Sequence, residues 1–165
     1  MAKLKKLMIG MIASASMASA LLATPAAATT SSFPWLCIGD NYDGGGWKLS
    51  APGWISPGKV ICTGNYELAM QGDGNLVLYN ANGSAIWASG TYGHSAAALN
   101  MQADGNLVVY STYNNSSSTP LWATGTWGNS GSYFFFQPDG NLVVYRYGGG
   151  PSTGGALWAS GTYGK

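Results

Sequence analysis

The amino-acid sequence predicts an all-β fold in which three similar antiparallel sheets of three or four strands surround a pseudo-threefold axis. Three observations lead to this prediction: a segment that occurs three times, turn residues between its short apolar runs, and the lack of helical periodicity. No window beyond the first thirty residues repeats apolar side chains with a period of 3.6 residues, so we expect essentially no helix. Three small sheets cannot each bury a face alone, but around one axis they can share a core.

The repeated segment consists of two blocks. The first block reads MQGDGNLVLY, MQADGNLVVY and FQPDGNLVVY, and it begins at Met70, Met101 and Phe136. The second block reads IWASGTYG, LWATGTWG and LWASGTYG, and it begins at Ile86, Leu121 and Leu157. Successive copies lie 31 and 35 residues apart, because the segments that join the two blocks differ in length. These joining segments are rich in Asn, Ser, Gly and Pro, which predicts surface loops.

Each repeat is predicted to contain three strands. In the first repeat, the β-prone runs 66–70 and 76–79 flank an Asp-Gly pair, which is a strong hairpin signal because glycine accepts a positive φ. The third strand begins at the Ile/Leu-Trp-Ala part of the second block. We interpret the tryptophans of that block as core residues near the axis, each burying about 200 Å². The alternative, stacking on a sugar, is less consistent with their aliphatic neighbours. These residues are Trp87, Trp122 and Trp158.

Residues 1–28 are predicted to be a secretory signal peptide. Three lysines precede an apolar stretch, and Ala26-Ala27-Ala28 supplies small side chains for cleavage. A membrane anchor is the less favoured alternative, because a span needs about 20 apolar residues and serines interrupt this stretch. We therefore expect a secreted, extracellular protein without membrane insertion, and the form of the signal indicates a bacterial source. Residues 29–48 would then be an N-terminal extension, and residues 49–165 would be the repeat domain.

The predicted mature chain carries few charges. Four cations remain against six acids, a formal net charge of −2: Lys48, Lys59, Arg146 and Lys165. A basic surface for phosphate backbones is therefore lacking, and we expect no nucleic-acid partner. The abundance of uncharged polar and aromatic side chains favours a neutral ligand such as a sugar.

The chain has two cysteines, Cys37 and Cys62. In an exported protein a disulfide between them is the default expectation, and two buried thiols are the alternative. A bridge that encloses 24 residues would stabilise the fold by about 3 kcal/mol in the chain-entropy model.

Five residues stand at every second position in the first block of each repeat. Side chains alternate between the faces of a strand, so we expect these five to line one concave surface. A carboxylate, two amides and a phenol could exchange hydrogen bonds with adjacent hydroxyls of a sugar, while the valine contacts its C–H face. The candidate binding residues are Gln71, Asp73, Asn75, Val77 and Tyr79; Gln102, Asp104, Asn106, Val108 and Tyr110; and Gln137, Asp139, Asn141, Val143 and Tyr145. Leu76, Leu107 and Leu142 would face the core.

This motif, Q-x-D-x-N-x-V-x-Y, occurs three times and is followed each time by a tryptophan block. In this respect the chain resembles the bulb-type (monocot, B-lectin) mannose-binding lectins, over residues 49–165. The resemblance implies a β-prism II fold of three antiparallel four-stranded sheets around a pseudo-threefold axis, with one mannose site per motif. It implies that the Asp and Asn side chains bind the axial 2-hydroxyl, Gln the 3-hydroxyl, Tyr the 4-hydroxyl, and that Val contacts the ring carbons. The cysteines depart from the usual family pairing, which joins the first two repeats.

The residues do not favour an enzyme. Outside the motifs the only acids are Asp40, Asp43 and Glu67, and the single histidine, His94, stands in a polar loop. The motif aspartates are predicted on different sheets and could not face each other across a scissile bond. We expect no catalytic residue, no metal and no cofactor. The expected partners are mannose and mannose-rich glycans, with a homodimer as an open possibility. The alternative is a lectin-like antibacterial or protein-binding module on the same fold.

Overall fold

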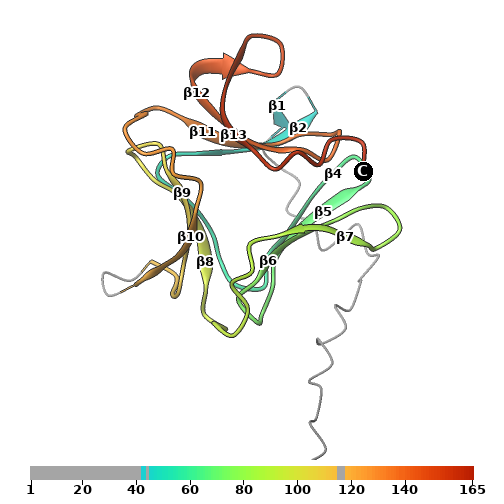
Figure 1. The fold of residues 1–165 in the computed structure, drawn as a ribbon, viewed down its shortest axis with the longest axis vertical. Coiled ribbons are helices and arrows are strands. Elements are labelled where there is room, and N and C mark those ends of the chain that lie inside the picture. The colour runs from blue at the N-terminus through green and yellow to red at the C-terminus, as the bar shows by residue number, and fades with distance from the viewer. Residues whose placement is uncertain (1–41, 44, 115–117) are drawn as a thin grey trace, which may run out of the picture. The chain divides into compact units, whose positions relative to one another are not determined.

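The computed structural model describes residues 42–43, 45–114 and 118–165, all of which lie within the unit Ser31–Lys165. These described residues form thirteen strands and no helix, and every strand pairing is antiparallel. The strands make three sheets around a common centre (Figure 1). The predicted all-β class and the β-prism II arrangement are therefore confirmed.

Each repeat contributes three consecutive strands to a sheet of its own. The first repeat forms β5 (Tyr66–Met70), β6 (Leu76–Tyr79) and β7 (Ala85–Ala88). The second repeat forms β8 (Ala98–Met101), β9 (Leu107–Tyr110) and β10 (Pro120–Ala123). The third repeat forms β11 (Tyr133–Phe136), β12 (Leu142–Gly150) and β13 (Gly154–Ala159). The tight connections between consecutive strands explain why neighbours in sequence are also neighbours in each sheet.

The segment before the first repeat supplies the fourth strand of all three sheets. β2 (Gly46–Ser50) pairs with β11, β3 (Gly53–Ile55) with β8, and β4 (Val60–Thr63) with β5. A two-residue strand, β1 (Tyr42–Asp43), adds a fifth strand beside β2. The boundary that the sequence places between residues 48 and 49 falls inside β2. Residues 46–48 therefore belong to the sheet, because Trp47 and Lys48 already pair with β11.

One hydrophobic core fills the space between the sheets. The leucines that follow the motif turns are 1% exposed, as predicted: Leu76, Leu107 and Leu142. The three repeated tryptophans pack against this core and against one another, with ring centroids 5.3, 5.4 and 5.9 Å apart and interplanar angles of 72–76°. They are half-buried rather than fully buried. Edge-to-face contact among three rings from three sheets ties the repeats together at the axis.

Two predictions concern residues outside the described part of the chain. The predicted signal peptide, residues 1–28, lies outside it. Cys62 lies in β4, but Cys37 also lies outside, so the Cys37–Cys62 bridge stays a prediction. Within the described ranges, no helix is long and apolar enough to cross a membrane.

Candidate functional site

The first three motif positions of each repeat lie in a hairpin turn. Between β5 and β6, the N–H of Gly74 donates to the carbonyl of Gln71 at 3.0 Å, and the N–H of Gln71 donates to the carbonyl of Asn75 at 2.9 Å. The same bonds close the turns at 102–106 and 137–141. The alternation of a strand therefore does not bring these positions to one face, contrary to the sequence argument. Only the valine and the tyrosine lie in a strand, and the turn itself directs the others.

The turn needs a glycine for two reasons: its φ is positive, and a side chain there would have no space. Gly74 has a φ of +91°, and a Cβ there would collide with the carbonyl oxygen of His94. The loop that carries His94 is held close because its N–H groups at positions 93 and 94 donate to the carbonyl of Asp73 at 2.8 and 3.0 Å. His94 is exposed, as expected for a loop residue, and its backbone supports the turn.

The motif aspartate stays exposed while it shapes the turn. Oδ1 of Asp73 accepts a hydrogen bond from the N–H of Asn75 at 2.9 Å. Asp104 and Asp139 make the same bond at 3.0 and 2.9 Å. This bond is typical of aspartate in turns and holds the carboxylate in place. The group can then accept hydrogen bonds from a ligand without a large loss of side-chain freedom.

The motif asparagine has a structural role that the sequence did not reveal. Oδ1 of Asn75 accepts hydrogen bonds from the N–H groups of Gly90 (3.0 Å) and Thr91 (3.1 Å), and from the Ser89 hydroxyl at 3.2 Å. The amides that hold the equivalent segments 124–126 and 160–162 are Asn106 and Asn141. Since Oδ1 is occupied, the Nδ2 hydrogens are the groups left to meet a ligand. The site thus places an acceptor, Asp, beside a donor, Asn.

The glutamine and the tyrosine meet across the hairpin in the first two repeats. Nε2 of Gln71 donates to the hydroxyl of Tyr79 at 2.6 Å, and Nε2 of Gln102 donates to the hydroxyl of Tyr110 at 2.9 Å. The pKa of Tyr79 is raised, mainly by burial; the bond from Gln71 lowers it, and the charges of Asp73 and Glu67 raise it further. The phenol therefore stays protonated at neutral pH and keeps a hydrogen to donate.

The third repeat departs from this pattern. Tyr145 is only 5% exposed, and its ring lies 5.7 Å from that of Tyr133 and 6.5 Å from that of Phe135. Among the residues that the structure describes, Gln137 makes no side-chain hydrogen bond to Tyr145. Burial, and to a lesser extent the charge of Asp139, raises the pKa of Tyr145. The third phenol is thus packed among aromatic rings rather than presented beside a glutamine.

The neighbouring strand makes the three sites chemically different. The residues that pair directly with the motif tyrosines Tyr79, Tyr110 and Tyr145 are Glu67, Ala98 and Tyr133. Those that pair with the motif valines Val77, Val108 and Val143 are Ala69, Asn100 and Phe135. Side chains directly opposite each other share a face of the sheet, so each pair borders one site. The sequence analysis did not identify these paired residues, although the residue types at these positions differ among the three repeats.

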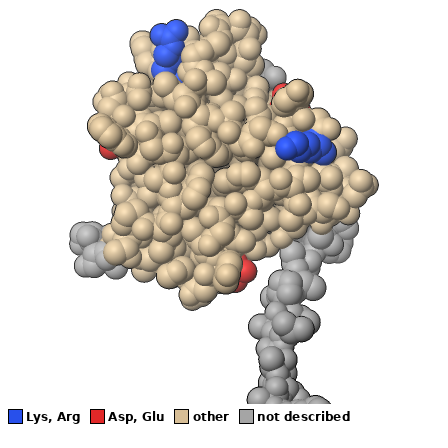
Figure 2. Space-filling view, in the orientation of Figure 1, with Lys and Arg blue, Asp and Glu red and all other residues tan. Residues whose placement is uncertain are grey.

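A pocket of about 370 Å³ lies beside the third turn, and Gln137 is the one motif residue that lines it. It is lined by Tyr133, Phe135, Gln137, Pro138 and residues 149–153 of the β12–β13 hairpin. Figure 2 shows large uncharged areas between the few Lys, Arg, Asp and Glu side chains on the face drawn. Among the described residues, no group of three or more His, Cys, Asp or Glu could hold a metal ion. The three turns thus offer hydrogen bonds and apolar contacts to a small neutral polyol.

Solved structures with the same fold include several lectins. The chain is 42% identical to monomeric monocot mannose-binding lectins from Gastrodia elata, covering 70% of this chain and 97% of that one, with a TM-score of 0.58. It is 38% identical to the mannose-specific agglutinin of snowdrop (Galanthus nivalis), solved with methyl-α-D-mannoside, over 70% and 96% of the two chains, with a TM-score of 0.53. It is 36% identical to the Polygonatum cyrtonema lectin, solved with a monomannoside, over 70% of this chain and 96% of that one, with a TM-score of 0.51. No family model and no curated protein matches the chain.

Proposed function

Because this chain belongs to the bulb-type monocot mannose-binding lectins, we propose that it is a non-enzymatic carbohydrate-binding protein that recognises mannose through its three motif turns. The observation that carries this proposal is the Asp–Asn pair of each turn. One sugar hydroxyl can donate to the aspartate and accept from Nδ2 of the asparagine at the same time. Such a hydroxyl satisfies both groups, and each group is fixed in place by the turn.

This pair can distinguish mannose from glucose. The axial 2-hydroxyl of mannose would lie between Asp73 and Asn75, whereas an equatorial 2-hydroxyl points elsewhere and leaves both groups without a sugar partner. An unpaired polar group costs about 1–3 kcal/mol when it is removed from water. The Tyr79 hydroxyl, which accepts from Gln71, can donate to the 4-hydroxyl, and the Gln71 amide can reach the 3-hydroxyl.

We expect the affinity of each single site to be low, and we expect several sites that bind together to raise the avidity. A shallow site with neutral hydrogen bonds is expected to have a Kd of about 1 mM. Three sites per chain raise the avidity for dense mannose-rich glycans where their spacing allows joint binding. We propose in addition that the protein is exported after removal of residues 1–28 and that Cys37 and Cys62 form a disulfide. A homodimer would add further sites.

The test is chromatography on immobilised mannose. The folded protein should be retained and should elute with free methyl α-mannoside, but not with methyl α-glucoside at the same concentration. A protein with Asp73, Asp104 and Asp139 all changed to Asn is the matched control, because it keeps the shape of the turns and lacks the carboxylates. If the folded wild-type protein passes through the column without retardation, the mannose proposal is wrong, and a module that binds a protein partner becomes the better description.

A further inference from the structure

The residue that faces the motif tyrosine across the sheet differs in charge among the three repeats. The residues opposite Tyr79, Tyr110 and Tyr145 are, in this order, Glu67, Ala98 and Tyr133. Directly opposed side chains share a face of the sheet, with Cβ atoms about 4.5–5.5 Å apart. Of the three motif tyrosines, the first is therefore the one that has a carboxylate as its partner across the strands.

The Glu67 carboxylate is half-buried and lacks a partner among the residues that the structure describes. It accepts no hydrogen bond and forms no ion pair there, and burial is what raises its pKa. A carboxylate that loses water without gaining a partner is poorly stabilised in its charged form. A cation beside Glu67 would stabilise that form.

Glu67 acts at the end of the first site where the Tyr79 hydroxyl lies. Burial raises the pKa of Tyr79 most, and the charges of Asp73 and Glu67 raise it further, so both carboxylates act on this phenol. The hydroxyl also accepts a hydrogen bond from Gln71 at 2.6 Å. In the proposed mannose complex the Tyr79 hydroxyl meets the 4-position of the ring. A substituent at that position would therefore lie next to the reach of the Glu67 side chain.

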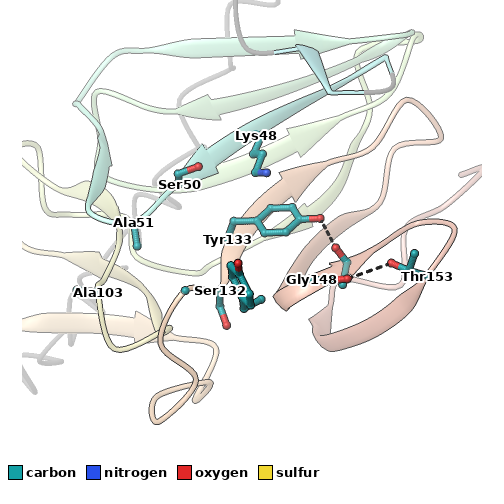
Figure 3. A pocket seen from close by; sticks show the side chains of 11 residues that line it. Lys48, Ser50, Ala51, Ala103, Ser132, Tyr133, Gly148 and Thr153 are labelled. Carbon is teal, nitrogen blue, oxygen red and sulfur yellow. Dashed lines mark hydrogen bonds between the residues drawn. The ribbon is translucent and has the colours of Figure 1, made fainter.

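The other two sheets have no negative charge at the equivalent place. In the second sheet the bond from Gln102 to Tyr110 is kept at 2.9 Å, but Ala98 carries no charge. In the third sheet the Lys48 amine lies 4.1 Å from the centroid of the Tyr133 ring, so the nearby charge is positive. Both residues line a pocket of about 490 Å³, and no carboxylate lines it (Figure 3). The three sites therefore present different charges to the same part of a ligand.

We infer that the first site prefers a mannoside with a positively charged amino group at its 4-position, and that Glu67 sets this preference. The inference rests on the proposed mannose binding. An ammonium group there can donate one hydrogen bond to the Glu67 carboxylate. It can donate another to the Tyr79 hydroxyl oxygen, which accepts from Gln71 through its other lone pair.

A metal ion is a less suitable cation for this place. Ca²⁺ takes about 6–8 oxygen ligands. The described part of the chain holds no group of three or more His, Cys, Asp or Glu that could bind a metal ion. A single ammonium group needs only the few acceptors that Glu67 and Tyr79 supply.

The test compares two proteins that retain one site each. Asp104→Ala with Asp139→Ala leaves the first site, and Asp73→Ala with Asp139→Ala leaves the second. Each protein is titrated by calorimetry at about pH 7 with methyl α-mannoside and with methyl 4-amino-4-deoxy-α-mannoside, an amine with a pKa of about 8. The first-site protein should bind the amino compound about fivefold more tightly, as expected for a partly exposed ion pair. For the second-site protein the ratio should be about one or less, because Ala98 offers the ammonium group no acceptor.

Changes at Glu67 test the cause. Glu67→Gln in the first-site protein should lower the ratio to that of the second-site protein. Glu67→Asp keeps the charge on a shorter side chain and should retain part of the preference. The matched control is Ser130→Lys, an exposed position in the loop between β10 and β11. It raises the net charge by the same one unit as Glu67→Gln and should leave the ratio unchanged.

Two kinds of failure can be told apart. Equal ratios in the first-site and second-site proteins, or a preference that survives Glu67→Gln, would overturn the inference alone. Failure of both proteins to bind either mannoside would overturn the proposed function as well.

Discussion

The first and third sites contain the same five motif residues but differ in what surrounds them. At the first site, Tyr79 is half-buried, accepts a hydrogen bond from Gln71 and faces Glu67 across the sheet. At the third site, Tyr145 is buried and packs against aromatic rings, and the β12–β13 hairpin lines a pocket beside Gln137. An identical motif therefore sets the position of the hydrogen-bonding groups. The neighbouring strand and the packing around the tyrosine decide how many of those groups stay accessible.

The largest expected effect comes from the part that the sites share. Trp122→Ala removes one ring from the cluster that joins all three sheets. Loss of a large aromatic side chain costs about 3–5 kcal/mol when it is fully buried, and the half-buried position places this change near the lower value. The free energy of unfolding, measured in urea, should fall by about 3 kcal/mol, and all three sites should lose mannose binding together on heating. Unfolding of the second repeat alone would show that the sites are structurally separate.

A smaller effect should separate the sites. Gln71→Ala removes the donor to Tyr79, so the phenol loses its orientation and the first site should bind methyl α-mannoside several-fold more weakly. Gln137→Ala breaks no such bond, and its effect on the third site should be smaller. Gln71→Ala is measured by calorimetry in a protein in which Asp104→Ala and Asp139→Ala leave only the first site. Gln137→Ala is measured in the same way in a protein in which Asp73→Ala and Asp104→Ala leave only the third. Equal losses at the two sites would show that glutamine acts on the sugar alone.

The smallest expected effect concerns Glu67, which borders only the first site. Burial raises the pKa of the Glu67 carboxyl, so the folded protein holds this proton more tightly than the unfolded chain does. The stability that this group contributes is present below pH 4.5 and is lost as the pH rises through the raised folded pKa. In Glu67→Gln this loss disappears, and the variant should gain in urea midpoint relative to the wild type as the pH rises from 4 to 7. A difference in urea midpoint that stays constant from pH 4 to 7 would contradict the raised pKa of Glu67.

The sequence was most informative where neighbouring residues decide the structure. The Asp-Gly turns, the apolar runs beside them and the threefold repeat predicted the hairpins, the strand class and the core leucines. The motif residues of each repeat lie in one turn and the strand after it, and their role in binding stays a prediction, but strand alternation was the wrong reason to group them. Strand alternation does not operate through residues 71–75, where a turn brings Gln71 to Tyr79 instead.

By itself, the sequence determined three equivalent β hairpins, each with an Asp, Asn, Gln and Tyr set, because turn chemistry and periodicity are properties of adjacent residues. The tertiary structure decided which strand completes each sheet, because the short segment 46–63 supplies one strand to all three. β2 and β3 pair with strands far away along the chain, whereas β4 pairs with the next strand, β5. The tertiary structure also decided that the asparagine amide holds a segment 14 to 16 residues away in the first repeat, and that the third motif lies beside a walled pocket. Such contacts depend on how distant segments pack, which no local pattern encodes.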